Sequence, residues 1–336
     1  TDMFTVGMSL PAVFGTDVPK GNYADLTTKG FELSVSWRDQ FQLASKPFNY
    51  EVRFTLADYQ STIDKYNNPE KKLGDDYYYE GMKVGEIWGY ETEGFFTSQA
   101  DIDSHAKQPY FYAGATAGQW LPGDIKFKDL NGDGVIDYGN NTVDNPGDQK
   151  IIGNSEPRFI YGINLSGDWN NFFVSAFFQG VGKQDWWPGS EASYFWGMYN
   201  RPYNDMPKSH LGNIWTEENP NTYFPRLRGY SSEEPYAELN LKQTRYLQNI
   251  AYIRMKNIQL GYTLPKSFIS KLRMQNAKVY VSGENLWSWS PFYKYSKDLD
   301  VEAVRGSDRD LTEGTSGNGY SYPILKSVSF GLSVTF

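Results

Sequence analysis

The stretch GFELSVSWRD at residues 30–39 alternates between apolar and polar side chains. Its apolar positions run from Phe31 to Trp37, and its polar positions run from Glu32 to Arg38. Successive side chains of an extended chain point to opposite faces, so a period of two predicts a β-strand. One face of that strand is continuously apolar, and the other carries charges.

The same alternation recurs along most of the chain, which predicts an all-β protein. We expect about nine strands, because each apolar and polar alternation of four to eight residues fits one strand. Short polar turns separate some of the runs, as expected of antiparallel hairpins. After the first stretch, the runs lie at residues 51–56, 159–166, 172–180, 252–264, 279–284 and 330–336.

Two local signals refine this pattern. The residues Asp168 to Asn171 are polar around one Trp and separate two alternating runs, so they predict a hairpin turn. In the run from Tyr252 to Leu264 the apolar parity changes near Lys256 and Asn257. A single extra residue in one strand shifts parity in this way, so the sequence predicts a β-bulge there.

The composition narrows the function classes. The 336 residues include 26 Tyr, 21 Phe, 10 Trp and 32 Gly, which favours strands and tight turns. The formal net charge is −8 and the isoelectric point is near 5.0, the wrong sign for binding phosphate backbones. The chain has no Cys and 2 His, so it offers neither a disulfide framework nor a multi-histidine zinc site. Because of the negative net charge, nucleic acid is not an expected partner.

The hydropathy of the chain is compatible with two kinds of β-protein. The mean hydropathy is −0.61, and no window approaches the roughly 20 apolar residues of a membrane helix. A transmembrane β-barrel also has low average hydropathy, because lipid-facing and lumen-facing residues alternate. A soluble antiparallel sandwich shows the same alternation. The pattern alone leaves both architectures open.

The lengths of the connections favour the membrane architecture. The connections at residues 168–171 and 265–273 are short. Those at 61–117, 182–247 and 287–323 are long, polar and rich in aromatic residues. Short turns on one side and long loops on the other are typical of outer-membrane barrels.

One motif resembles a cation-binding loop. The sequence DLNGDGVID at residues 129–137 matches the first nine positions of the Ca²⁺ loop pattern D-x-[DN]-x-[DN]-G. Its twelfth position is Asn140, where the pattern has a bidentate Glu, so it is not a full EF-hand. The alternative is an Asx-rich turn stabilised by its own side chains. On the first interpretation the oxygen ligands of a structural Ca²⁺ would come from Asp129, Asn131, Asp133, Val135 and Asp137.

No catalytic constellation is recognised, so we do not expect an enzyme. Several acidic residues lie in polar loops, where neighbouring carboxylates are usually solvated surface: Glu217, Glu218, Glu233, Glu234, Asp298 and Asp300. A glycosidase needs two carboxyl groups that converge on one bond, and spacing along the chain does not show convergence. Nucleophile-elbow, phosphate-loop and dinucleotide-binding patterns are not present in the sequence.

Aromatic residues concentrate in one loop that also carries Gly and Pro. Flat rings stack on sugar faces or on peptide side chains while keeping a polar group available. The alternative for any single ring is packing of the loop on itself. We predict that the cluster contacts a substrate or a capping partner through Trp186, Trp187, Tyr194, Phe195, Trp196, Tyr199 and Tyr203.

Several segments together resemble the carboxy-terminal half of SusC/RagA transporters, which are TonB-dependent receptors of Bacteroidetes. They include TKGFEL at residues 28–33, YIRMKN at 252–257 and YVSGENL at 280–286. The segments follow the order of the family across nearly the whole chain, and this order makes the resemblance specific. The other matching segments are the rest of 22–37, then 123–126, 129–137, 152–154, 157–159, 161–162, 177–180, 260–262 and the terminal strand that ends at Phe336.

The resemblance implies a plugged transmembrane β-barrel of about 22 antiparallel strands with long extracellular loops. Residues 1–336 would form a carboxy-terminal portion of that barrel, and the plug domain is not in this sequence. The sequence starts at Thr1 without a signal segment, which agrees with an origin in a longer chain.

The resemblance also implies a function. It predicts TonB-dependent import of oligosaccharides or peptides across the outer membrane, with a SusD-like surface lipoprotein and the TonB complex as partners and no organic cofactor. The alternative is a secreted all-β module that binds or degrades glycans. On the transporter interpretation, strand parity assigns six residues to the lumen: Glu32, Arg38, Glu51, Arg53, Tyr280 and Glu284.

Overall fold

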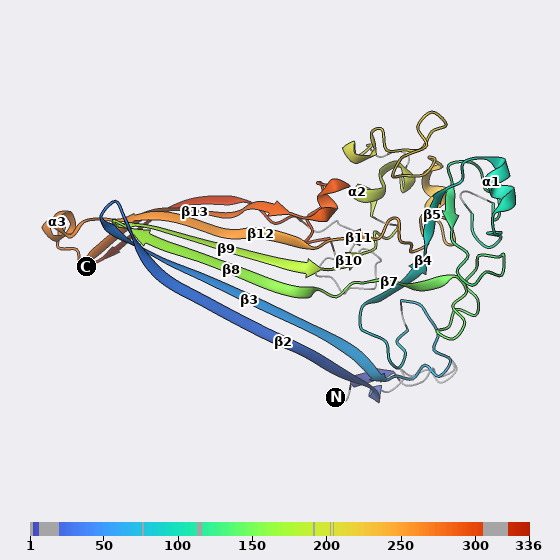
Figure 1. Cartoon of the computed structure of the whole chain (residues 1–336), viewed down its shortest axis with the longest axis horizontal. Coiled ribbons are helices and arrows are strands. Elements are labelled where there is room, and N and C mark those ends of the chain that lie inside the picture. Colours follow the sequence, from blue (N-terminus) through green and yellow to red (C-terminus); the bar gives the residue numbers. More distant parts are fainter. Residues whose placement is uncertain are drawn as a thin grey trace.

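The structure is a computed structural model dominated by one long antiparallel sheet (Figure 1). The sheet has eight strands in the order β1-β2-β3-β8-β9-β12-β13-β14. The prediction of an all-β architecture is confirmed. The structure describes residues 3–6, 20–75, 77–112, 116–190, 192–201, 203, 205–304 and 322–336.

From β2 onwards, each strand of this sheet pairs with the next one along the chain that belongs to it. This up-and-down order leaves β1 and β14 at the two edges of an open sheet. The strands are β1 (Met3–Val6), β2 (Lys20–Leu43), β3 (Lys46–Lys65), β8 (Arg158–Trp169), β9 (Phe172–Lys183), β12 (Tyr252–Thr263), β13 (Asn276–Trp289) and β14 (Ser327–Thr335).

Short connections gather at one end of the sheet. Ala44 and Ser45 turn the chain between β2 and β3 with φ values of 48° and 63°. Asn170 and Asn171 do the same between β8 and β9, with φ values of 49° and 71°. Positive φ at both central residues fits the twist of a two-residue hairpin. The predicted turn at 168–171 is thus correctly placed, but Asp168 still belongs to β8.

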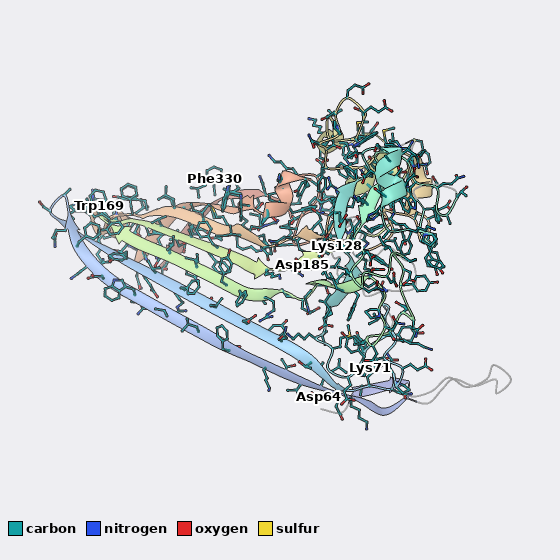
Figure 2. All side chains as sticks on the ribbon, turned by 45° about the vertical axis from the view of Figure 1, so that its right-hand side comes forward. Asp64, Lys71, Lys128, Trp169, Asp185 and Phe330 are labelled. Carbon is teal, nitrogen blue, oxygen red and sulfur yellow. The ribbon has the colours of Figure 1, made fainter. Side chains whose placement is uncertain are left out.

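The third short connection carries α3 (Lys266–Ile269) and η5 (Ser270–Leu272). Figure 1 shows α3 at the same end as the hairpin turns, far from the helix α1 (Gln99–Ser104). In Figure 2 the labelled Trp169 lies at this turn end, and Lys128 and Asp185 lie at the opposite, loop end.

The long connections fold together at the loop end. Their described parts lie within residues 66–157, 184–251, 290–304 and 322–326, between strands of the long sheet. Small antiparallel pairs inside them add strands that the alternation did not predict. These pairs are β4 (Glu86–Tyr90) with β7 (Gln149–Asn154), β5 (Thr92–Phe95) with β6 (Ile125–Phe127), and β10 (Asp185–Trp186) with β11 (Gln248–Asn249).

Short helical turns complete the loop end. In the described part of the chain, no helix is both long and apolar enough to cross a membrane. Besides α1, the helical turns are α2 (Ser193–Trp196), η2 (Gly197–Tyr199), η3 (Lys208–His210), η4 (Gly229–Glu233) and η6 (Pro291–Lys294).

Strand registers align the apolar residues in rows across one face of the long sheet. In one row Val35 lies opposite Phe54, and Phe54 lies opposite Ile163. The row continues through Phe178, Met255 and Trp287. This face is open: Trp37 is 62% exposed and Phe330 is 86% exposed. An apolar surface of this extent marks a contact with lipid or protein.

The opposite face of the sheet is polar in the same registers. Arg38 lies opposite Glu51, and Glu51 lies opposite Ser166. The row ends at Ser329 of β14, after passing through Ser175, Gln259 and Ser282.

The predicted bulge in β12 is confirmed. The registers with β9 and β13 both shift between Met255 and Asn257. One extra residue at this point keeps Met255 and Ile258 on the same apolar face, although their spacing of three would otherwise separate them.

The hydrophobic core lies within the loop end and not beneath the long sheet. Fully buried side chains there include Phe111, Ile125, Phe127, Trp196 and Tyr246. The loops therefore form a packed body with its own core, in which side chains can be held rigidly.

Candidate functional site

The aromatic loop contributes most of its rings to the core. Trp186, Phe195, Trp196 and Tyr199 are buried, and Trp187 is partly buried. Other side chains surround the four buried rings, and contact of the aromatic cluster with a substrate or a capping partner stays a prediction. Packing of the loop, the alternative interpretation, describes them. Tyr194 and Tyr203 remain accessible, at 54% and 78% exposed.

The polar groups of these buried rings are also satisfied internally. Trp196 Nε1 donates to the Pro188 carbonyl oxygen at 3.0 Å, and Tyr199 Oη donates to the Pro225 carbonyl oxygen at 2.6 Å. A buried donor needs such a partner, since its loss costs about 1–3 kcal/mol. Neither group is available to a ligand.

His210 belongs to the same core. Its ring is fully buried, 4.0 Å from the ring of Phe224 between centroids. Its Nε2 lies 2.9 Å from the Phe195 carbonyl oxygen. Burial lowers the pKa of His210, and the hydrogen bond to the carbonyl opposes this only in part. The side chain acts as a neutral core residue.

The six residues assigned to the lumen share the polar face of the sheet. Arg38 Nε and Glu51 Oε2 form a cross-strand ion pair at 3.0 Å. Beside them, Arg53 Nε donates to Ser36 Oγ at 3.2 Å. The others are Glu32 in β2, together with Tyr280 and Glu284 in β13.

The Asx motif forms a loop stabilised by its own side chains. The Asp129 carboxylate accepts hydrogen bonds from the amides of Gly132 and Gly134, at 2.6 and 2.9 Å. Asn131 Oδ1 accepts from the Asp133 amide at 2.9 Å. Further along, Asp133 accepts from the Val135 amide and Asp137 accepts from the Gly139 amide, at 2.8 and 2.7 Å.

This geometry matches the Asx-turn interpretation of the motif. Within the described residues, no group of three or more Asp, Glu, His or Cys side chains is arranged to hold a metal ion. The Ca²⁺ ligand set therefore stays a prediction from the motif.

Asp148 anchors this loop and was missed by the sequence analysis. It is fully buried, and its carboxylate accepts from the amides of Leu130 and Asp137 at 2.7 and 2.9 Å. Burial raises the pKa of Asp148, although these backbone donors oppose the shift. A single Asp beyond the end of the motif carries no periodic or spacing signal, so only the structure reveals it.

The loop leads directly into a cavity of about 460 Å³. Tyr138 follows Asp137 and lines the cavity, and the Asn141 amide donates to the Tyr138 carbonyl oxygen at 2.8 Å. The remaining lining comes from Phe111, Asn141 and Gln149 and from residues within 73–75, 77–90 and 236–242. These segments are far apart in sequence and form no motif, which is why the site was not predicted.

A buried ionic cluster lies close in sequence to one lining segment of this cavity, residues 236–242. Asp124 is fully buried, and Arg228 binds its carboxylate with two contacts of 3.0 and 2.7 Å. Glu238 is also fully buried and accepts from the Ile125 amide at 2.7 Å. Burial raises the pKa of Asp124 to about 6, against the opposing effect of Arg228. The cluster fixes residues 226–238 against residues 121–127.

Comparison with known proteins agrees with this architecture. No family model matches the chain. It is 26% identical to TonB-dependent receptor P3 of Formosa agariphila, over 97% of this chain and 30% of the relative. It is likewise 26% identical to TonB-dependent receptor P26 of the same organism, over 100% of this chain and 32% of the relative. Over nearly its whole length, the chain is thus similar in sequence to TonB-dependent receptors.

Solved structures show the same fold. The RagAB peptide importer in its open-open state matches 100% of this chain and 31% of its own chain, with a TM-score of 0.63 and 19% identity. The RagAB peptide transporter matches 98% of this chain and 32% of its own chain, with a TM-score of 0.65 and 18% identity. The chain thus spans about a third of the length of the TonB-dependent receptors and RagAB chains that it matches.

Proposed function

We propose that the chain is part of the barrel of an outer-membrane nutrient importer driven by TonB. The observation that carries this proposal is the open apolar face of the long sheet. Rows such as Val35, Phe54, Ile163 and Phe178 are continuous across neighbouring strands, and the polar rows lie on the other face. A soluble sandwich would cover such a face with a second sheet. A barrel presents it to lipid.

The polar face then lines the lumen. Charged and hydroxyl side chains, including the Arg38–Glu51 pair, give the pathway its polarity. The loop body at one end of the strands would lie outside the membrane, where it meets the nutrient first. The exposed Tyr194 and Tyr203 are the members of the aromatic loop that stay candidates for contact with the substrate or a partner.

The partners in this proposal are a SusD-like surface lipoprotein, the TonB complex and outer-membrane lipid. The substrates are oligosaccharides or peptides that are captured at the loop body and then pass through the lumen. Support comes from the SusC/RagA-like sequence and from the fold shared with the RagAB peptide importer. The Asx motif still predicts a hard cation such as Ca²⁺, which a Ca²⁺ titration of the unfolding temperature would detect.

Fractionation of native membranes tests the proposal. The chain should stay with the outer membrane after washes with salt and carbonate, and a surface lipoprotein should purify with it in detergent. Release as a soluble monomer would contradict the proposal. It would favour the alternative, a secreted module that binds or degrades glycans.

A further inference from the structure

The cavity beside the Asx loop has the size and chemistry of a ligand site. Its volume of about 460 Å³ falls within the usual range of roughly 300–1,000 Å³ for small-molecule sites. Its lining combines seven aromatic residues with three side-chain amides. The aromatic lining consists of Tyr77, Tyr79, Trp88, Tyr90, Phe111, Tyr138 and Tyr236.

Three of these rings are accessible at the surface. Tyr77, Tyr138 and Tyr236 are 46%, 37% and 56% exposed. The rings of Tyr138 and Tyr236 lie 6.3 Å apart with an interplanar angle of 35°. Their hydroxyls, like that of Tyr77, make no hydrogen bond to the described part of the chain. The rings therefore offer flat faces and free hydroxyls to a ligand.

The backbone at Tyr236 is held in an unfavourable conformation. Its φ is +67°, in the left-handed region that bulky residues seldom occupy. Such strain costs of order 1–3 kcal/mol and clusters at functional sites. Neighbours hold it in place: the Glu238 amide donates to the Tyr112 carbonyl oxygen at 2.8 Å, and Tyr112 Oη donates to the Pro235 carbonyl oxygen at 2.9 Å. Core packing does not explain a strained residue whose ring is exposed.

Hydrogen bonds on both sides of Tyr138 also hold its backbone in place. The Asx loop ends at Asp137, whose amide is bound by the buried Asp148 at 2.9 Å. On the other side, the Asn141 amide binds the Tyr138 carbonyl oxygen. The Asx loop thus positions one ring of the cavity, a role that the sequence motif did not indicate.

Two of the three charged residues in the lining form an ion pair, and the third is hydrogen-bonded. Lys242 Nζ forms an ion pair with Asp75. Glu86 accepts hydrogen bonds from the Tyr79 hydroxyl and from the Lys83 amide. Among the described lining residues no other side chain is charged. The one cation of the lining is thus already paired, so the cavity does not suit an acidic ligand and fits a neutral one.

We propose that this cavity binds a neutral oligosaccharide, with sugar rings stacked on Tyr138 and Tyr236. A sugar ring has a flat CH face and a rim of hydroxyls. These complement the open aromatic faces, the phenol hydroxyls, and the amides of Asn141, Gln149 and Asn240. The inference rests on the proposed function and narrows it to glycan capture at the loop body.

Calorimetry on the detergent-purified native protein, with its companions, tests the site. The probes are maltoheptaose, laminarihexaose, xylohexaose and mannohexaose, with tetra-alanine and trigalacturonate for comparison. We expect at least one neutral glycan to bind. Tyr138→Ala and Tyr236→Ala should each weaken binding about three- to tenfold, the range expected for one lost stacking contact. Tyr138→Phe should keep most of the affinity.

Phe268→Ala is the matched control, because this exposed ring lies in α3 at the turn end. The site is overturned if no neutral glycan binds, or if the two Ala variants bind like the control. Binding of tetra-alanine alone would overturn the substrate class. The membrane-fractionation result does not depend on these variants, so failure of the site is distinguishable from failure of the importer proposal.

Discussion

At the residue scale, glycines beneath aromatic rings explain part of the polar face of the sheet. Phe173 lies over Gly261, and Tyr280 lies over Gly331 on the neighbouring strand. A Cβ at Gly261 would come within 2.2 Å of Phe173 Cζ, and one at Gly331 within 2.1 Å of Tyr280 Cζ. Large rings can thus lie flat on a face that stays open above them.

Gly261→Val should destabilise the folded protein by about 1–3 kcal/mol, because the added atoms displace the Phe173 ring. The measurement is the urea midpoint of the detergent-folded protein. Ser175→Val, on the same face in the strand next to Gly261, is the control and should change the midpoint little. Equal midpoints for both variants would show that the ring moves aside without cost.

The buried His210 predicts a loss of stability in acid. Burial lowers its pKa, so the unfolded chain binds a proton more readily than the folded protein does. The neutral side chain contributes to stability at pH values above the pKa of an unfolded His, about 6.5. This contribution is lost as the pH falls towards the lower pKa that His210 has in the folded protein.

Thermal unfolding between pH 7.5 and pH 5 tests this sign. The wild-type protein should lose more stability over this range than His210→Phe, which has no titrating group at that position. Parallel curves for the two proteins would assign the acid sensitivity to other groups.

At the scale of elements, buried side chains from one segment hold the backbone of another. Asp148 does this for the Asx loop, and Glu238 does it for the segment around Ile125. Loops with such anchors behave as fixed surfaces, since their amides are bonded without regular secondary structure. These anchors hold in place the loops that line the cavity.

Asp148→Ala should loosen the Asx loop, because the amides of Leu130 and Asp137 lose their hydrogen-bond acceptor. Leaving a buried amide without an acceptor costs about 1–3 kcal/mol of stability. Limited proteolysis should then cut near residues 129–140 faster than in the wild type. Asp144→Ala is the control, since its exposed carboxylate meets Lys71 only at 3.8 Å. Unchanged cleavage in the Asp148 variant would contradict the anchoring role.

At the scale of the whole molecule, the apolar face of the sheet is proposed to contact lipid, and the polar face is proposed to line the lumen. Leu260 and Gln259 are adjacent in β12 and point to opposite faces. The turns lie at one end of the strands and the packed loop body at the other, as Figure 1 shows. This polarity is what an importer needs in order to separate capture outside from passage within.

Leu260→Lys should reduce the amount of folded protein in the outer membrane, because a Lys on the lipid face costs about 2–4 kcal/mol near the bilayer centre. Gln259→Lys places the same charge on the polar face and should be tolerated. Heat-modifiable mobility on gels measures the folded fraction of both. Equal tolerance of the two variants would contradict the lipid assignment of the apolar face.

Local patterns in the sequence predict the strands β2, β3, β8, β9 and β12 to β14 of the long sheet, its two faces, the bulge near Lys256 and the grouping of short turns at one end. These features follow from side-chain parity and turn chemistry, which act between neighbours along the chain. The residues from Phe31 to Trp37 already define which face is apolar, and each later strand repeats the choice.

Only the tertiary structure decided which loop aromatics are core and which are accessible. Trp196 and Tyr236 are both loop aromatics by sequence, yet one is fully buried and the other faces a cavity. The role of Asp148 was equally hidden. Burial, ring contacts and anchoring depend on segments that are distant in sequence and meet only when the loops fold together, so no local pattern encodes them.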